Sequence, residues 1–247
     1  MDDVVDALDA AAGTTCLVGA GGKKTTLYAL ADRLERAVLT ATVRIPIFDR
    51  EVADVRVTED PVAALAEPAN AAAEDAFPLG LVPERERDDR YRGYDPAVVD
   101  EIGAAHGGPV LVKADGARTR LFKAPNEREP QLPASADRVV PVASVGAVGE
   151  PLTGETVHRP ERVTAITDAE LGDEITPELV GRVLAHERGG LKDVPPDATA
   201  IPLINAVDDA DDEGVGREIA RVVRERADVP RVVLARMIEG EVVAVVE

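Results

Sequence analysis

Short apolar runs alternate with amphipathic segments along most of this chain. Strands are predicted where a short apolar run stands between turn residues, at 14–18, 37–43, 52–57, 77–82, 109–114, 137–143 and 198–205. Helices are predicted where apolar residues recur at intervals of three or four, at 2–12, 27–34, 95–105, 176–186 and 215–223, with a single helical turn at 61–65. The densely charged run at 84–92 is predicted to be an exposed loop.

This alternation predicts the fold class. Strands that are apolar on both faces and are separated by helices indicate a mostly parallel sheet covered on both sides. We therefore expect an α/β fold, a P-loop-type three-layer sandwich, in which 231–237 and 241–246 close the sheet as an antiparallel edge hairpin. No internal repeat or linker divides the chain, so residues 1–247 are predicted to form one nucleotide-binding domain.

The composition indicates which residues form the core, which binding surfaces are disfavoured and in what solvent the protein works. Apolar residues make up 45% of the chain and aromatic residues only 2%, so Val, Leu, Ile and Ala must form the core. The net charge of −19 argues against a nucleic-acid or anionic-membrane surface. Only five lysines (23, 24, 113, 123 and 192) accompany 23 arginines. Such a Lys-poor, acidic composition is typical of a salt-loaded cytoplasm, where salt screens self-repulsion.

The sequence also favours a cytoplasmic location. The first 15 residues carry four Asp in place of a basic and apolar leader. No apolar run approaches the roughly 20 residues of a membrane helix. The single Cys16 excludes an internal disulfide and fits a reducing compartment.

The strongest chemical signal is the turn between the strand at 14–18 and the helix that follows it. It reads Gly19-Ala20-Gly21-Gly22-Lys23-Lys24-Thr25-Thr26. Glycines let backbone N–H groups point at a phosphate, a Lys reaches the outer phosphates, and a Thr hydroxyl binds Mg²⁺. The short spacing G-x-x-G-K favours Lys23 as the phosphate ligand, whereas an alignment on Lys24-Thr25 favours Lys24. The turn predicts binding of ATP or GTP, with Mg²⁺ held by Thr25 or Thr26.

Further candidate residues follow two other apolar strands. Asp115 directly follows the strand at 109–114. An acidic residue at this end of a parallel strand is expected to bind Mg²⁺, here together with Thr25. We expect Asp115 to serve the metal and not the fold, so that Asp115→Asn leaves the metal-free melting temperature nearly unchanged. Lys123 is a candidate second anion contact. Asn205 and Asp208 have the form of a guanine-reading element, without the Lys that normally stands between them.

Together these residues resemble the YqeC family. The resemblance rests on Gly19-Ala20-Gly21-Gly22-Lys23 with Thr25-Thr26, Thr40-x-Thr42, Ala114-Asp115-Gly116-Ala117, Leu121-x-Lys123-Ala124-Pro125, Glu129-Pro130, Val157-His158-Arg159 and Asn205-x-x-Asp208. The sequence A-D-G-A followed by K-A-P and E-P is its most specific part. The chain departs from the family at Lys24, which shifts the turn, and at Lys113, where an acidic residue is expected.

The resemblance implies an accessory protein of selenium-dependent molybdenum hydroxylases, also described as a selenium cofactor biosynthesis protein. The expected partners are a nucleotide, a selenium- or molybdopterin-containing intermediate and a molybdenum hydroxylase. Lys123 and Arg159 would face the second substrate, and with Asp115 they are the candidate catalytic residues. The reaction stays open between nucleotide hydrolysis and phosphoryl or nucleotidyl transfer. Two alternatives are a small-molecule kinase or ATP-dependent ligase, and a non-catalytic nucleotide-sensing partner of a hydroxylase.

Overall fold

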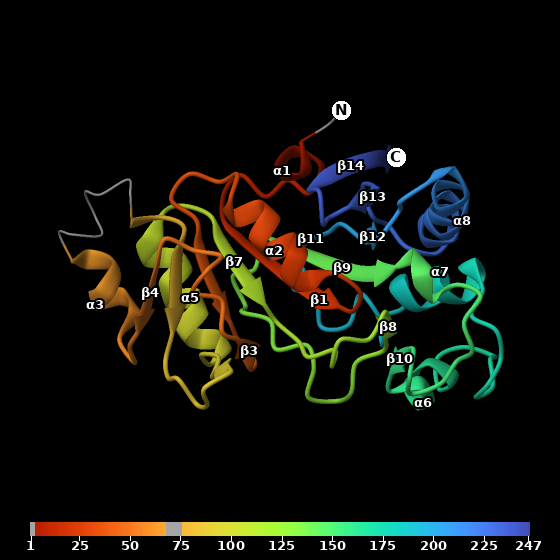
Figure 1. Cartoon of the computed structure of the whole chain (residues 1–247), viewed down its shortest axis with the longest axis horizontal. Coiled ribbons are helices and arrows are strands. Elements are labelled where there is room, and N and C mark those ends of the chain that lie inside the picture. Colours follow the sequence, from red (N-terminus) through yellow and green to blue (C-terminus); the bar gives the residue numbers. More distant parts are fainter. Residues whose placement is uncertain (1–2, 68–75) are drawn as a thin grey trace.

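A mostly parallel sheet of ten strands runs through the molecule (Figure 1). The computed structural model describes residues 3–67 and 76–247. In spatial order the strands are β14 (Glu241–Val246), β13 (Val232–Arg236), β12 (Leu203–Asn205), β9 (Arg138–Ser144), β1 (Thr14–Gly19), β7 (Val110–Lys113), β2 (Val38–Ala41), β5 (Leu79–Val82) and β4 (Asp54–Val57), while β11 (Thr199–Ala200) pairs with the start of β9. Among the strand pairs that the described residues form in this sheet, only the β13–β14 pair is antiparallel. The predicted α/β fold with its C-terminal edge hairpin is confirmed.

Helices cover both faces of this sheet (Figure 1). One face carries α1 (Val4–Ala7) and α2 (Lys23–Ala31), and the other carries α5 (Pro96–His106), α7 (Pro177–Leu184) and α8 (Ala210–Arg226). Strand β1 shows why both faces must be covered. Leu17 packs in the cluster that contains α1 and α2, whereas its neighbours Cys16 and Val18 pack in the cluster that contains α5. Alternate side chains of a strand point to opposite faces, so an apolar run needs a layer on each side.

Two short strand pairs stand apart from the main sheet. β3 (Ile45–Pro46) pairs antiparallel with β6 (Arg90–Tyr91), and β8 (Phe122–Lys123) pairs in parallel with β10 (Val157–His158). The prediction of an exposed loop at 84–92 is therefore wrong at its end, because Tyr91 is only 2% exposed and packs edge-on against Phe48 at 5.5 Å between ring centroids. The remaining short elements are α3 (Pro61–Ala66), α6 (Pro160–Thr164) and the 3-10 turn η2 (Val145–Ala147).

Several predicted elements differ in length from the observed ones, among them the helices predicted at 27–34 and 215–223, which are observed as α2 and the longer α8. Two of these differences have a local backbone cause. The first helix is predicted to span 2–12, of which residue 2 lies outside the described residues. The observed helix α1 ends at Ala7. Asp9 has a φ of 53°, which is incompatible with a right-handed helix. The predicted strand at 198–205 is divided into β11 and β12, and Pro202, which has no backbone N–H, stands between them.

In the part of the chain that the structure describes, no helix combines the length and the apolar character needed to cross a bilayer.

Substitutions of buried residues in the central strands should lower the free energy of unfolding most. Leu111 in β7 is fully buried, so Leu111→Ala should lower the free energy of unfolding by about 2–5 kcal/mol through lost burial and the cavity left behind. Leu171→Ala is the matched control, because Leu171 is 63% exposed and should change stability by about 0.5 kcal/mol or less. Urea unfolding at one high KCl concentration measures both, and equal losses would contradict the described core.

Candidate functional site

The glycine-rich turn joins β1 to α2 at the carboxyl edge of the sheet. Gly19 and Gly21 have φ angles of 90° and 82°, in the left-handed region that side chains rarely adopt. A Cβ on Gly19 would also collide with the backbone of Val142, and one on Gly21 would lie 2.5 Å from the carbonyl oxygen of Leu121. The turn therefore needs glycine both for its conformation and for its close approach to neighbouring chain.

The position of this turn favours ligand binding. β1 lies between β9 and β7 in the sheet. The chain leaves β1 through α2 and reaches β2 on the far side of β7, whereas from β9 it leads to β12 on the side away from β1. Connections that leave adjacent parallel strands in opposite directions open a crevice at their carboxyl ends, where open α/β sheets bind ligands. The N-terminus of α2 points its unpaired N–H groups to the same edge, which favours an anion.

Asn205 holds the turn in place. Its side-chain Nδ2 donates to the carbonyl oxygen of Gly21 at 2.7 Å, and its Oδ1 accepts from the backbone N–H of Met237 at 3.0 Å. Asp208, its predicted partner in reading a base, is exposed in the loop before α8. The structure therefore brings Asn205 to the glycine turn but does not place Asp208 beside it, so contact with a base stays a prediction.

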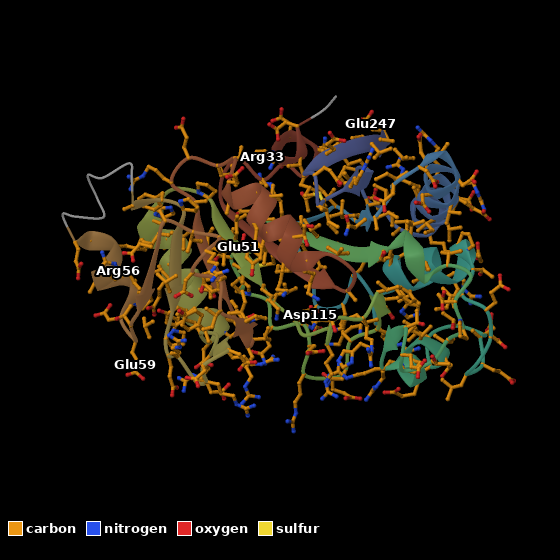
Figure 2. The ribbon with its side chains drawn as sticks, viewed as in Figure 1. Arg33, Glu51, Arg56, Glu59, Asp115 and Glu247 are labelled. Atoms are coloured by element: carbon orange, nitrogen blue, oxygen red, sulfur yellow. The ribbon has the colours of Figure 1, made fainter. Side chains whose placement is uncertain are left out.

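Three of the five lysines of the chain are buried together behind this turn. Lys23, Lys113 and Lys123 are 5%, 6% and 4% exposed, and Asp115 is 1% exposed. The carboxylate of Asp115 lies between two of them, with Oδ1 2.9 Å from Nζ of Lys23 and Oδ2 2.9 Å from Nζ of Lys123. Figure 2 marks Asp115 within the molecule. Each oxygen of this buried carboxylate thus lies within ion-pair distance of one ammonium group.

Two backbone contacts join this ion pair to the glycine turn. The N–H of Gly19 donates to Oδ2 of Asp115 at 2.8 Å, and Nζ of Lys23 also donates to the carbonyl oxygen of Gly19. Lys23 is the first residue of α2, and its side chain thus returns over the turn from which the helix begins. This geometry favours the short G-x-x-G-K alignment, in which Lys23 contacts phosphate.

Glu129 extends the cluster to Arg159. Its Oε2 lies 2.9 Å from Nζ of Lys123 and 2.6 Å from Nη1 of Arg159. The pairing of β8 with β10 sets Lys123 beside His158 and brings Arg159 to the same place. The motifs K-A-P and E-P, which are close in the sequence, and V-H-R, which follows Glu129 by about 30 residues, thus meet around one carboxylate. Sequence reasoning noted Glu129 only as part of the family resemblance and did not select it as a site residue.

Lys113 is a functional candidate that sequence reasoning missed. Its Nζ donates to the backbone carbonyl oxygens of Arg44 and Asp115 at 2.9 and 2.8 Å. Burial, together with the positive charge of Lys23, lowers the pKa of Lys113 to about 7. The signal was present in the sequence, because a Lys at the end of an apolar strand is unusual in a chain with five lysines.

The electrostatics of this cluster favour an anionic ligand. Three cationic side chains (Lys23, Lys123 and Arg159) surround two carboxylates (Asp115 and Glu129), and Lys113 lies beside them with its Nζ on the backbone carbonyl oxygen of Asp115. Burial opposes ionisation of Asp115, but Lys23 and Lys123 outweigh it and lower the pKa of this carboxyl group. Burial and the charge of Arg159 lower the pKa of His158 to about 4, so its ring is neutral near pH 7. The cluster keeps an excess of positive charge within an acidic protein.

The residues predicted to hold Mg²⁺ do not fit that ion as they are arranged. Thr25 lines a separate open groove on α2 together with Tyr28 and Asp32, and Asp115 is not among the residues of that groove. Figure 2 marks Arg33 and Glu51, which line the same groove. The hydroxyl of Thr26 donates to the carbonyl oxygen of Gly22 at 3.1 Å. Among the residues described, no group of three or more acidic, His or Cys side chains is placed to bind a metal.

Comparison with known proteins supports the family resemblance. A family model described as YqeC protein matches residues 15–161, a range that contains the glycine turn and the whole charged cluster. A protein of Escherichia coli strain K12, described as "Uncharacterized protein YqeC", is 27% identical over 199 residues, which cover 76% of this chain and 74% of that protein.

The buried ion pairs revise what is expected of Asp115. Asp115→Asn would leave Lys23 and Lys123 without their carboxylate in the interior, a change that typically costs about 3–5 kcal/mol. Urea unfolding without metal or nucleotide should show this loss, whereas Asp88→Asn, at an exposed position, should cost about 0.5 kcal/mol or less. An unchanged stability of Asp115→Asn would restore the expectation that Asp115 serves a metal alone.

Lys113 should make stability depend on pH in the alkaline range. Its pKa is about 7 in the folded protein but about 10.4 in an unfolded chain. Between these values the unfolded state binds more protons, so stability should rise with pH, with a slope that approaches about 1.4 kcal/mol per pH unit. Urea unfolding between about pH 7 and pH 10 should show a smaller rise for Lys113→Met than for the wild type or for Lys192→Met. Equal slopes in all three proteins would show that Lys113 is protonated throughout this range.

Proposed function

The chain belongs to the YqeC family, and we propose that it is an ATP- or GTP-binding accessory factor in the maturation of selenium-dependent molybdenum hydroxylases. The observation that carries nucleotide binding is the meeting of a glycine turn, a helix N-terminus and three buried lysines at one crevice of the sheet. The hydroxylase pathway is supported by the family resemblance alone.

In this proposal the β- and γ-phosphates lie over the turn from Gly19 to Lys23. The backbone N–H groups of the turn and of the first residues of α2 donate to the phosphate oxygens. Nζ of Lys23, which donates to the carbonyl oxygen of Gly19 and pairs with Asp115 beside the turn, reaches the outer phosphates. Asn205 keeps the turn in its anion-binding conformation through the carbonyl oxygen of Gly21.

Lys123 and Arg159 serve a second substrate in this proposal. Glu129 binds both cations through one carboxylate oxygen, and it therefore sets their spacing. Arg159 keeps 23% of its side chain exposed, whereas Lys123 is buried, so Arg159 is the member of the pair that an incoming anion can reach. An arginine so placed stabilises charge that develops on a transferred phosphoryl group.

One observation favours a transferase over a nucleotide sensor. A group transfer needs a base near neutral pH, and both carboxylates of the cluster are bound by cations. Lys113 has a pKa of about 7 and donates to two carbonyl oxygens. A neutral amine can make both of those hydrogen bonds and still keep a lone pair, so Lys113 is the candidate base.

Nucleotide binding is tested by calorimetry at high KCl with ATP and with GTP. The wild type should bind at least one of them, and ligand at 100 times its dissociation constant should add about 2.7 kcal/mol of apparent stability. Gly21→Ala should weaken binding by about tenfold or more, because its Cβ would enter the space of Leu121 and Ser144. Gly154→Ala is the matched control, because a Cβ there meets nothing within 4 Å.

The outcomes of this experiment separate the candidate functions. Absence of binding by both nucleotides to the folded wild type would overturn the proposal. Tight binding without turnover would identify the sensor. Turnover that Lys113→Met abolishes, while binding persists, would identify an enzyme with Lys113 as its base, with water as the acceptor in the absence of a second substrate. Circular dichroism of each variant separates lost binding from lost folding.

A further inference from the structure

The first turn of α2 differs from a magnesium-binding phosphate turn at one decisive position. In such a turn the residue after the phosphate-binding Lys carries a hydroxyl that reaches the metal. Here Lys23 is that Lys by its contact with Gly19, and the next residue is Lys24. Lys24 is partly exposed, and its side chain has no ion pair or hydrogen bond within the described ranges 3–67 and 76–247.

The second expected metal ligand is also engaged elsewhere. Asp115 holds Lys23 on one oxygen, and Lys123 and the N–H of Gly19 on the other. A divalent cation at this carboxylate would displace both ammonium groups in a buried place. It would also stand between Lys23 and Lys123, whose charges repel it. The lysines therefore already supply the positive charge that a metal would bring.

Thr25 cannot replace the missing hydroxyl in this arrangement. It follows Lys23 by two residues, a little over half a turn around the helix. Its side of α2 faces the open groove with Tyr28 and Asp32, while Lys23 and Leu27 are buried on the side that faces the sheet. A hydroxyl on the groove side does not share a metal with Asp115.

From this donor set we infer that the site binds the phosphate groups of its ligand as a metal-free anion, with Lys24 in the place of the magnesium ion. The ligand class is a nucleoside di- or triphosphate, or inorganic pyrophosphate, held by backbone N–H groups and lysine ammonium groups. This inference rests on the proposed nucleotide binding and adds how the phosphate charge is neutralised. Ammonium groups suit this role because they donate charge-assisted hydrogen bonds to phosphate oxygens.

The test compares binding with and without divalent cations. The wild type is titrated with ATP, GTP and pyrophosphate at high KCl, first in buffer stripped of metals with a chelating resin and then with added MgCl₂. The affinity in metal-free buffer should equal or exceed the affinity with MgCl₂. Binding that appears only with MgCl₂ would overturn the inference and leave the proposed nucleotide binding intact. Binding under neither condition would overturn the proposed function itself.

Variants at position 24 test the assigned role of Lys24. Lys24→Thr restores the hydroxyl of a magnesium-binding turn, so its metal-free affinity should fall by about tenfold or more and should recover in part with MgCl₂. Lys24→Ala should lose affinity without that recovery. Lys192→Ala removes a lysine outside the cluster and should bind like the wild type. Full metal-free affinity in both position-24 variants would overturn the role of Lys24.

Discussion

The structure depends on the buried carboxylate of Asp115, which lies between Lys23 and Lys123. The three residues come from three elements: the end of β7, the first turn of α2 and β8. Charges removed from water are stable in the interior only when their partners are present with good geometry. The ion pairs therefore hold these elements to one another, and β8 in turn brings β10 and Arg159 to the cluster. The groups that fold this region are thus also the groups that prepare it for an anion.

The parallel sheet explains why these residues meet at all. Parallel strands place their carboxyl ends at one edge, so segments about one hundred residues apart in the chain arrive at the same crevice. β1 ends at Gly19, β7 leads into Asp115, and β12 ends at Asn205. Each contributes a different part of the site: the glycine turn, the carboxylate that pairs with the lysines, and the amide that holds the turn. The connections reverse direction beside β1, which is the place where open α/β sheets bind ligands.

The distribution of charge separates the surface from the site. The chain has a net charge of −19, yet three of its five lysines are buried around one aspartate. The acidic surface repels an anion only over a short distance when salt is concentrated, because the Debye length falls to about 3 Å at 1 M ionic strength. Buried charges are screened much less, so salt weakens the proposed attraction of the lysine cluster for phosphate less than it weakens the repulsion by the surface. A salt-rich environment is therefore compatible with an anion site in a strongly acidic protein.

The sequence by itself determined the elements whose signals are local. Apolar runs indicated the main strands because a buried parallel strand must be apolar on both faces. The glycines of the turn after β1 indicated backbone conformations with positive φ, which residues with side chains rarely adopt. It also indicated the positions of Lys23, Asp115, Lys123 and Arg159 as candidates. Only the tertiary structure decided what these groups do, because burial and ion pairing depend on contacts between distant segments. In the tertiary structure Asp115 forms ion pairs with two ammonium groups, and Thr25 lines a separate groove on α2. Asn205 donates a hydrogen bond to the carbonyl oxygen of Gly21. The energy of a charge depends on its surroundings, and no local pattern of residues contains them.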